Sequence, residues 1–147
     1  MSQTYVPVAL RRLVRERARD CCEYCLVPEA VTLIPHWIDH IVAEKHGGKT
    51  EAANLANACI LCNQRKGSDL SSVDPLSSEI VVLFHPRRDR WTDHFRIVGG
   101  RIEPLTAIGR ATSRLMHFND PDRVAERTQM LAEGLLVPPN EQGDEVE

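Results

Sequence analysis

Apolar residues recur at helical spacing near both ends of the chain. Leu10 and Val14 follow Pro7 in this way. Because proline is favoured in the first turn of a helix, this pattern predicts an N-terminal helix of about three turns. Two more helices are predicted from the same spacing, near residues 108–118 and 121–135.

Segments rich in β-branched and aromatic residues predict short strands. The first spans residues 32–42, where Pro35 marks a sheet edge or an entry bend, and the second lies near residues 55–58. Further strands are predicted at residues 80–84 and in a hairpin of residues 95–98 and 101–103, whose turn is Gly99-Gly100.

The segment between the first two strands and the segment after them also carry local signals. Thr50 and the residues after it predict a short capped helix before Asn54. Residues 63–66 predict a helix that ends at Gly67, since glycine is favoured just after a helix. Residues 36–67 are therefore predicted to form a strand, a loop, a strand and a helix.

Helices alternating with short hairpins indicate an α+β fold. With 147 residues, the chain is long enough for one domain with a hydrophobic core and too short for two independent ones. We expect a core at residues 1–70 and an α+β extension at residues 71–137 that packs on the core within the same domain. Residues 138–147 are expected to be a disordered acidic tail.

The charge balance does not indicate a strongly basic nucleic-acid binder. There are 18 Lys and Arg against 21 Asp and Glu, for a net charge of -3, and the acidic tail leaves the rest of the chain near neutral. Basic residues do cluster at residues 11–19, 65–66 and 87–90. Each cluster fits either phosphate contacts or a solvated face with acidic neighbours.

The cysteines carry the strongest chemical signal. Two Cys-x-x-Cys pairs, Cys22/Cys25 and Cys59/Cys62, provide four thiolates, a set that suits tetrahedral structural zinc. A four-sulfur site leaves no open position for substrate, so this zinc would be structural. The interval from Leu26 to Ala58 holds 33 residues, longer than the roughly 15 to 20 of a simple zinc ribbon, so a folded insertion is expected there.

Cysteine use also bears on location. The fifth cysteine, Cys21, lies outside the ligand spacing and is read as a small, partly buried side chain. Thiols available to a metal fit a reducing compartment. The start of the chain lacks the apolar segment of a signal peptide, and no stretch approaches the ~20 apolar residues of a membrane span. We expect a soluble, cytoplasmic protein without a membrane partner.

The insertion between the cysteine pairs contains a candidate hydrolytic site. An imidazole changes charge near neutral pH, so His40 is a candidate general base, while Asp39 and an amide oxygen suit a hard cation. His36, four residues earlier, is either an additional partner or a structural strand histidine. Arg65 and Lys66 follow the second cysteine pair, and this position favours them as phosphate contacts, with bracing of the helix end as an equal alternative for Lys66.

Taken together, these motifs resemble the HNH endonuclease family. The resemblance rests on Ile38-Asp39-His40-Ile41, Gly47-Gly48, Asn54-Leu55 and Cys59-x-x-Cys62-Asn63-x-x-Lys66-Gly67, with the upstream Cys22-Glu23-Tyr24-Cys25. It covers roughly residues 8–70. It implies a ββα-metal fold, in which a hairpin and a helix hold one divalent ion against a phosphodiester.

The resemblance also implies roles for individual residues. His40 matches the general base, Asp39 the carboxylate ligand, and Asn63 the last motif position, which also binds the catalytic ion. Asn54 matches the middle Asn, which braces the loop and helps to orient the base. Because the last position is Asn rather than His, Mg²⁺ or Mn²⁺ is expected at the catalytic site.

The expected function is metal-dependent cleavage of nucleic acid, with DNA as the expected substrate. One alternative is a zinc-stapled nucleic-acid-binding module without turnover, which the near-neutral charge allows. A rubredoxin-like iron protein would also use paired Cys-x-x-Cys motifs, but it gives no reason for Asp39-His40 or Asn63. Strandedness, sequence specificity, pathway and subunit number are not indicated by the sequence.

Overall fold

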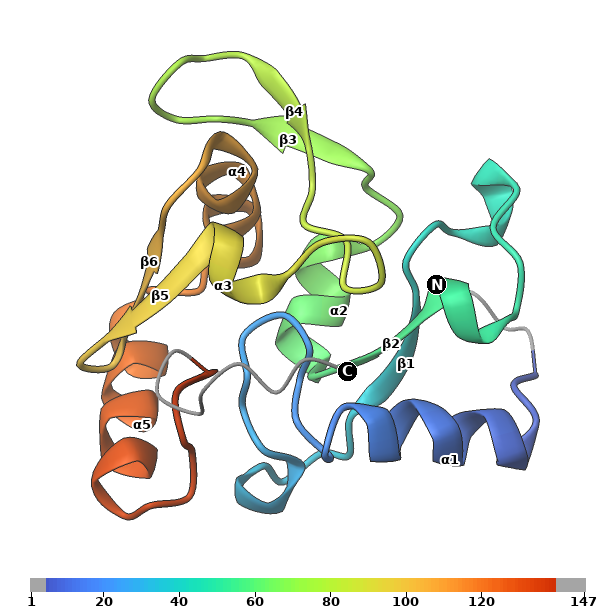
Figure 1. The fold of residues 1–147 in the computed structure, drawn as a ribbon, viewed down its shortest axis with the longest axis horizontal. Coiled ribbons are helices and arrows are strands. Elements are labelled where there is room, and N and C mark those ends of the chain that lie inside the picture. Colours follow the sequence, from blue (N-terminus) through green and yellow to red (C-terminus); the bar gives the residue numbers. More distant parts are fainter. Residues whose placement is uncertain (1–4, 140–147) are drawn as a thin grey trace. The chain divides into compact units, whose positions relative to one another are not determined.

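A computed structural model describes residues 5–139, which divide into two units (Figure 1). The first unit takes its described residues from Met1–Leu70 and His85–Asp89, and the second takes them from Ser71–Phe84 and Arg90–Glu147. Both units combine helices with small antiparallel hairpins. The predicted α+β class is therefore confirmed.

The expected packing of residues 71–137 on the core within one domain stays a prediction. The expected acidic tail falls outside the described residues except for Pro138 and Pro139. Among the described residues, no helix is both long and apolar enough to cross a bilayer.

The first unit is built on one hairpin and two α-helices. Its elements in chain order are α1 (Val8–Arg17), the 3-10 helix η1 (Glu29–Val31), β1 (Trp37–His40), the 3-10 helices η2 (Glu44–His46) and η3 (Ala52–Asn54), β2 (Leu55–Ala58) and α2 (Ile60–Lys66). β1 and β2 are antiparallel, with Asp39 opposite Ala56 and His40 opposite Leu55. The predicted order of strand, loop, strand and helix is observed.

The first predicted strand is much longer than the observed one. Only the four residues of β1 pair with β2, because the chain turns before it reaches the hairpin. The Thr32 hydroxyl donates to the carbonyls of Glu29 and Ile34 at 2.8 and 2.9 Å, and Pro35 follows. These local contacts replace ladder hydrogen bonds over the first part of the predicted strand.

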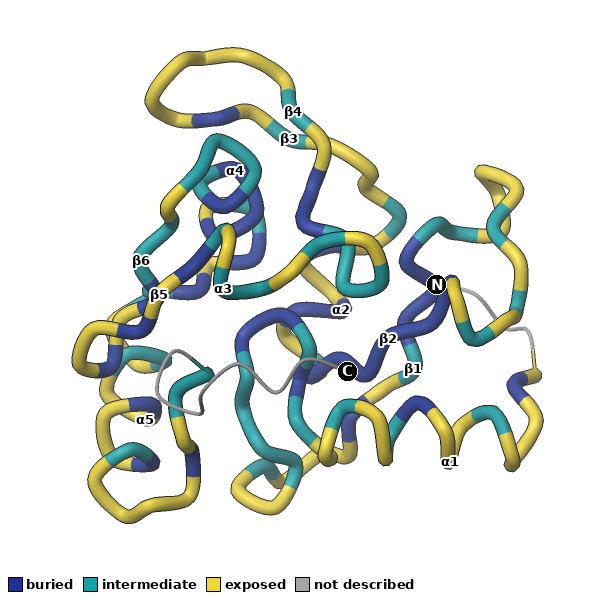
Figure 2. The backbone as a smooth tube through the Cα atoms, viewed as in Figure 1, coloured by how far each residue is buried: buried dark blue, intermediate teal, exposed yellow. Residues whose placement is uncertain are grey.

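α1 closes the apolar side of the hairpin. Val14 and Leu55 are fully buried and pack together with Val6, and Figure 2 shows β2 as a continuous buried stretch. Arg17, at the end of α1, donates to the carbonyls of Ala52 and Leu55 at 3.0 and 2.8 Å. The N-terminal helix therefore holds the start of β2 both by apolar packing and by the hydrogen bonds of Arg17.

A short downstream segment belongs to the first unit. The guanidinium of Arg87 forms an ion pair with Glu23, while the other Glu23 carboxylate oxygen accepts from the backbone N–H of Asn57 at 2.8 Å. Arg87 keeps only 14% of its side chain exposed. This basic residue is thus held by an ion pair within the first unit, whereas Arg88 and Arg90 are exposed.

The second unit has two hairpins and three helices among its described residues. Its elements are β3 (Ser71–Val73), β4 (Ile80–Val82), α3 (Trp91–His94), β5 (Phe95–Val98), β6 (Arg101–Pro104), α4 (Ala107–Met116) and α5 (Pro121–Ala132). The β5–β6 hairpin and the last two helices match the predicted elements. β3 was not predicted, because Ser71 and Ser72 give it little apolar pattern.

Aromatic rings form the centre of the second unit. Phe95 packs edge-on against Phe84 and Phe118, with ring centroids 5.5 and 5.6 Å apart. Asn119 bridges the backbone N–H and carbonyl of Ile102 at 2.9 and 2.7 Å. α5 approaches the β5–β6 turn so closely that a Cβ at Gly100 would lie 2.3 Å from the Val124 carbonyl oxygen.

Candidate active site and zinc site

The four cysteines of the two predicted pairs lie together. Their Sγ atoms are all within 4.8 Å of one another, and all four residues are buried. Within each pair the second backbone N–H points at the first sulfur, with Cys25 N 3.4 Å from Cys22 Sγ and Cys62 N 3.5 Å from Cys59 Sγ. This arrangement is compatible with a structural zinc site, as the spacing predicts.

The electrostatics of the cluster favour a bound cation. Burial raises the pKa of the Cys22 and Cys62 thiols well above the ordinary value, so four thiolates would be unstable together without a compensating charge. Zn²⁺ supplies that charge in four-sulfur sites. Cys21 lies outside the cluster, and its Sγ contacts the Arg19 carbonyl oxygen at 3.4 Å.

β1 carries Asp39 into a buried position next to α2. The side chain of Asp39 is 4% exposed, and its Oδ2 accepts from the Tyr24 hydroxyl at 2.7 Å. The Lys66 ammonium lies 3.3 Å from Oδ1 and 3.2 Å from Oδ2, and it donates to the His40 carbonyl at 3.2 Å. Burial raises the pKa of Asp39, and Lys66 and Tyr24 oppose part of that shift.

His40 is the next residue on β1, so its side chain leaves the strand on the opposite side from Asp39. Its Nε2 lies 2.9 Å from the Thr50 hydroxyl and 3.9 Å from Oε1 of Glu44. Nε2 is therefore held by the Thr50 hydroxyl, whereas Nδ1 has no hydrogen-bond partner among the described residues.

Asn54 holds the loop between the two strands. Its amide accepts from the Val42 N–H and donates to the carbonyls of Val42 and Lys49, each at 2.9 Å. The loop packs so tightly here that a Cβ at Gly48 would lie 1.7 Å from the Val42 carbonyl oxygen, which only glycine avoids. The position of His40 at the end of β1 thus depends on Asn54 and Gly48.

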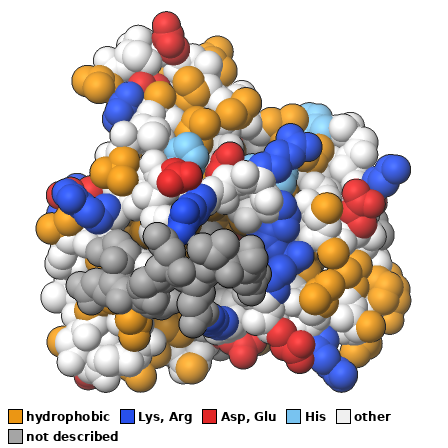
Figure 3. All heavy atoms as spheres, viewed as in Figure 1, with side chains coloured by type: hydrophobic (Ala, Val, Ile, Leu, Met, Phe, Trp, Pro, Cys, Tyr) orange, Lys and Arg blue, Asp and Glu red, His pale blue; other side chains and the backbone are white. Residues whose placement is uncertain are grey.

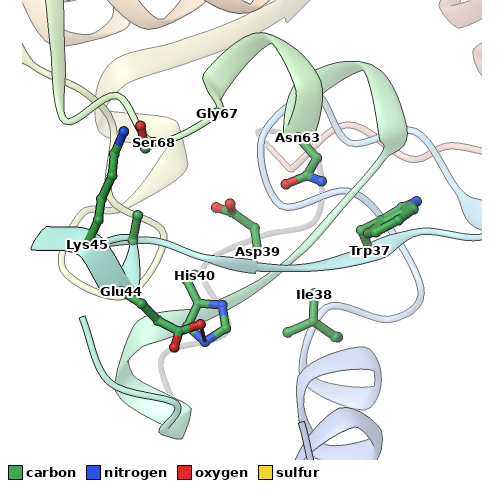
Figure 4. Close-up of a pocket in the computed structure, with 10 residues that line it drawn as sticks. Trp37, Ile38, Asp39, His40, Glu44, Lys45, Asn63, Gly67 and Ser68 are labelled. Atoms are coloured by element: carbon green, nitrogen blue, oxygen red, sulfur yellow. Dashed lines mark ion pairs between the residues drawn. The ribbon is translucent and has the colours of Figure 1, made fainter. Parts of the chain in front are cut away.

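Asn63, on α2, lines the same pocket as Asp39. Figure 4 shows the Asn63 amide and the Asp39 carboxylate directed into one pocket, with His40 on the other side of β1. The pocket has a volume of about 280 Å³ and is also lined by Glu44 and Lys45. A carboxylate and an amide oxygen are suitable ligands for a hard divalent cation that keeps several waters. The donor set therefore fits Mg²⁺ or Mn²⁺.

The two predicted phosphate contacts have different surroundings. Arg65 is exposed on α2, as a phosphate contact requires. Lys66 is 2% exposed, and its ammonium contacts Asp39 and the His40 carbonyl. Lys66 therefore binds the protein in this structure, and its role as a phosphate contact stays a prediction.

Three contacts were not foreseen from the sequence. The sequence indicated Tyr24 only as part of the first cysteine pair, and it predicted Thr50 as the cap of a short helix. Glu44 belongs to none of the motifs. Thr50 contacts His40 instead, and η3 has no side-chain cap. His36 does not line the pocket, and its Nε2 lies 2.8 Å from the Val27 carbonyl oxygen.

The model of the HNH endonuclease family matches residues 22–69. The resemblance drawn from the motifs is thus confirmed for this segment, which contains the four clustered cysteines and the pocket residues on β1 and α2. The match supports a nuclease or nucleic-acid-binding role in general. No curated protein and no solved structure matches the chain.

Proposed function

We propose that this protein is a metal-dependent HNH endonuclease that hydrolyses phosphodiester bonds of nucleic acid, with DNA as its substrate and the cytoplasm as its location. The observation that carries the proposal is that Asp39, His40 and Asn63 all line one pocket within the matched segment. A scaffold that only binds nucleic acid has no chemical need for this combination.

Asp39 and Asn63 are the proposed ligands of the catalytic cation, and Cys22, Cys25, Cys59 and Cys62 are the proposed ligands of structural zinc. A bound Mg²⁺ or Mn²⁺ would supply positive charge at the scissile phosphate and at the departing oxygen. Asp39 is held in place by Tyr24 and Lys66, so the carboxylate need not reorganise when the cation binds.

His40 is the proposed general base. The Glu44 carboxylate near Nε2 favours a proton on that nitrogen, which then donates to the Thr50 hydroxyl. Nδ1 is left with its lone pair and can take a proton from an attacking water. Asn54 supports this step by fixing the loop behind His40.

Substrate contacts are proposed for the exposed Arg65 and for Lys45, which is exposed and lines the pocket. On the face shown in Figure 3, Lys and Arg side chains lie in small groups among acidic and apolar ones. The net charge of -3 fits a few local phosphate contacts better than a strongly basic surface, so binding should be less sensitive to salt than that of a strongly basic protein.

One observation favours the alternative, a nucleic-acid-binding module without turnover. The Lys66 ammonium already neutralises Asp39 in the buried site, and a second cation beside it would be repelled. Under this alternative Asp39 and Lys66 form a structural pair, and Mg²⁺ or Mn²⁺ should have no effect on the zinc-loaded protein.

The deciding experiment is nicking of supercoiled plasmid by zinc-loaded protein, with and without Mg²⁺ or Mn²⁺. His40→Ala should keep zinc and the fold but lose cleavage by at least about 100-fold, the usual contribution of a general base. His117→Ala changes an exposed histidine in the second unit and should cleave normally. EDTA should stop wild-type cleavage while zinc stays bound, and unchanged nicking by His40→Ala would refute the assignment.

A further inference from the structure

The zinc site and the candidate cation site are joined by one side chain. Tyr24 lies inside the first Cys-x-x-Cys pair, between Cys22 and Cys25, and is fully buried. Its hydroxyl nevertheless contacts Oδ2 of Asp39 at 2.7 Å. A single tyrosine thus connects the turn that carries two zinc ligands with the carboxylate on β1.

The contacts of Asp39 leave its two oxygens unequal. Oδ2 accepts from Tyr24 at 2.7 Å and lies 3.2 Å from the Lys66 ammonium, whereas Oδ1 has the longer Lys66 contact of 3.3 Å. An ionised carboxylate offers about two acceptor sites on each oxygen. Oδ2 is therefore held by the short hydrogen bond from Tyr24, while Oδ1 accepts only the longer bond from Lys66 and keeps one acceptor site.

The hydroxyl of Tyr24 is well suited to hold a neighbour in one orientation. Tyrosine has few rotatable bonds, and here the ring is packed in the interior. The turn that carries Tyr24 is held by the contact of Cys25 N with Cys22 Sγ at 3.4 Å. Asp39 cannot rotate without breaking the hydrogen bond to Tyr24.

We propose that Tyr24 is a positioning residue, whose hydroxyl holds Oδ2 of Asp39 so that Oδ1 is presented to the catalytic cation. This inference rests on the proposed function. It gives the zinc site a second role beside stabilising the fold, because the zinc-bound turn then sets the orientation of a ligand in the active site.

The test is the binding of Mn²⁺ to zinc-loaded Tyr24→Phe, measured by calorimetry, with zinc content and thermal unfolding measured on the same samples. Only the hydroxyl is removed, so zinc content should not change. Partners that orient a metal ligand typically contribute 10- to 100-fold in metal affinity, so Mn²⁺ binding should weaken by about tenfold or more. Cleavage at saturating Mn²⁺ should fall less than cleavage at low Mn²⁺.

Tyr5→Phe is the matched control, since Tyr5 is 70% exposed and undergoes the same chemical change. It should bind Mn²⁺ like the wild type. If Tyr24→Phe bound Mn²⁺ as tightly as the wild type, or more tightly, the positioning role would be wrong while the nuclease proposal stood. If the wild type itself neither bound Mn²⁺ nor cleaved DNA, both proposals would be wrong.

Discussion

Lys66→Met tests whether the ion pair with Asp39 is truly buried. The two side chains are 2% and 4% exposed, and Nζ lies 3.2 Å from Oδ2. With an effective dielectric constant near 20, two unit charges at this distance attract by about 5 kcal/mol. Part of that attraction only offsets the cost of removing both charges from water. Deleting one partner leaves the other charge buried and typically costs about 3–5 kcal/mol.

A double-mutant cycle separates the pair from the packing around it. Asp39→Asn keeps an acceptor for Tyr24 and Lys66, so we expect it to cost less than Lys66→Met. Lys66→Met/Asp39→Asn removes both charges and should be more stable than the two single losses predict, by about 2 kcal/mol. Lys49→Met, at an exposed lysine, should change stability by less than about 0.5 kcal/mol.

The assay must report on the first unit alone. The chain has two tryptophans, Trp37 in the first unit and Trp91 in the second, so the cycle is measured by urea unfolding in a Trp91→Phe background. Fluorescence of Trp37 then follows the unit that contains the pair. A Lys66→Met variant within about 1 kcal/mol of its parent, or strictly additive losses, would show that the ammonium is hydrated and that the reasoning is wrong.

Two further predictions address the units separately. Asn54→Ala removes three hydrogen bonds to Val42 and Lys49 and should lower the free energy of unfolding of the first unit, followed by Trp37 fluorescence, by about 2–4 kcal/mol. Asn119→Ala removes the bonds to Ile102 and should change only the unfolding that Trp91 fluorescence follows. A change in the Trp37 transition for both variants would contradict this. Arg110 holds the pKa of Asp74 well below its usual range, so this pair stabilises the second unit above about pH 4 and loses that contribution as the pH falls. Thermal unfolding followed by Trp91 fluorescence should therefore depend less on acid pH in Asp74→Asn than in the wild type. Equal acid sensitivity of the two proteins would argue against this.

Much of the first unit could be predicted because its signals are local. The two cysteine pairs, the Asp39-His40 dipeptide and Gly67 each specify chemistry or backbone geometry within a few residues. The two-strand hairpin and the following helix then follow from their order in the chain. The same holds for the Gly99-Gly100 turn of the second unit, where β5 before the turn alternates between buried and exposed residues.

The missed features depend on contacts between residues far apart in the sequence. Tyr24 and Lys66 meet Asp39 across 15 and 27 positions, and no periodicity records such a meeting. Lys66 was predicted as a phosphate contact, and lysine is rarely buried. Its ammonium is instead paired with Asp39 and the His40 carbonyl. The same reason applies to Arg87, whose partner Glu23 lies 64 residues away.

These long-range contacts change how the separation of the cysteine pairs is understood. Asp39 lies on the hairpin inserted between the pairs, whereas its contacts come from the segments that the pairs hold. Tyr24 is part of the first pair, and Lys66 follows the second on the seven-residue helix α2, one turn after Asn63. Loss of the proposed zinc would leave both the turn that carries Tyr24 and the start of α2 without their metal ligation. Asp39 would then lose the support of both Tyr24 and Lys66. The proposed structural zinc and the proposed catalytic cation would therefore not be independent, because the zinc would fix the residues that hold the proposed ligand of the cation.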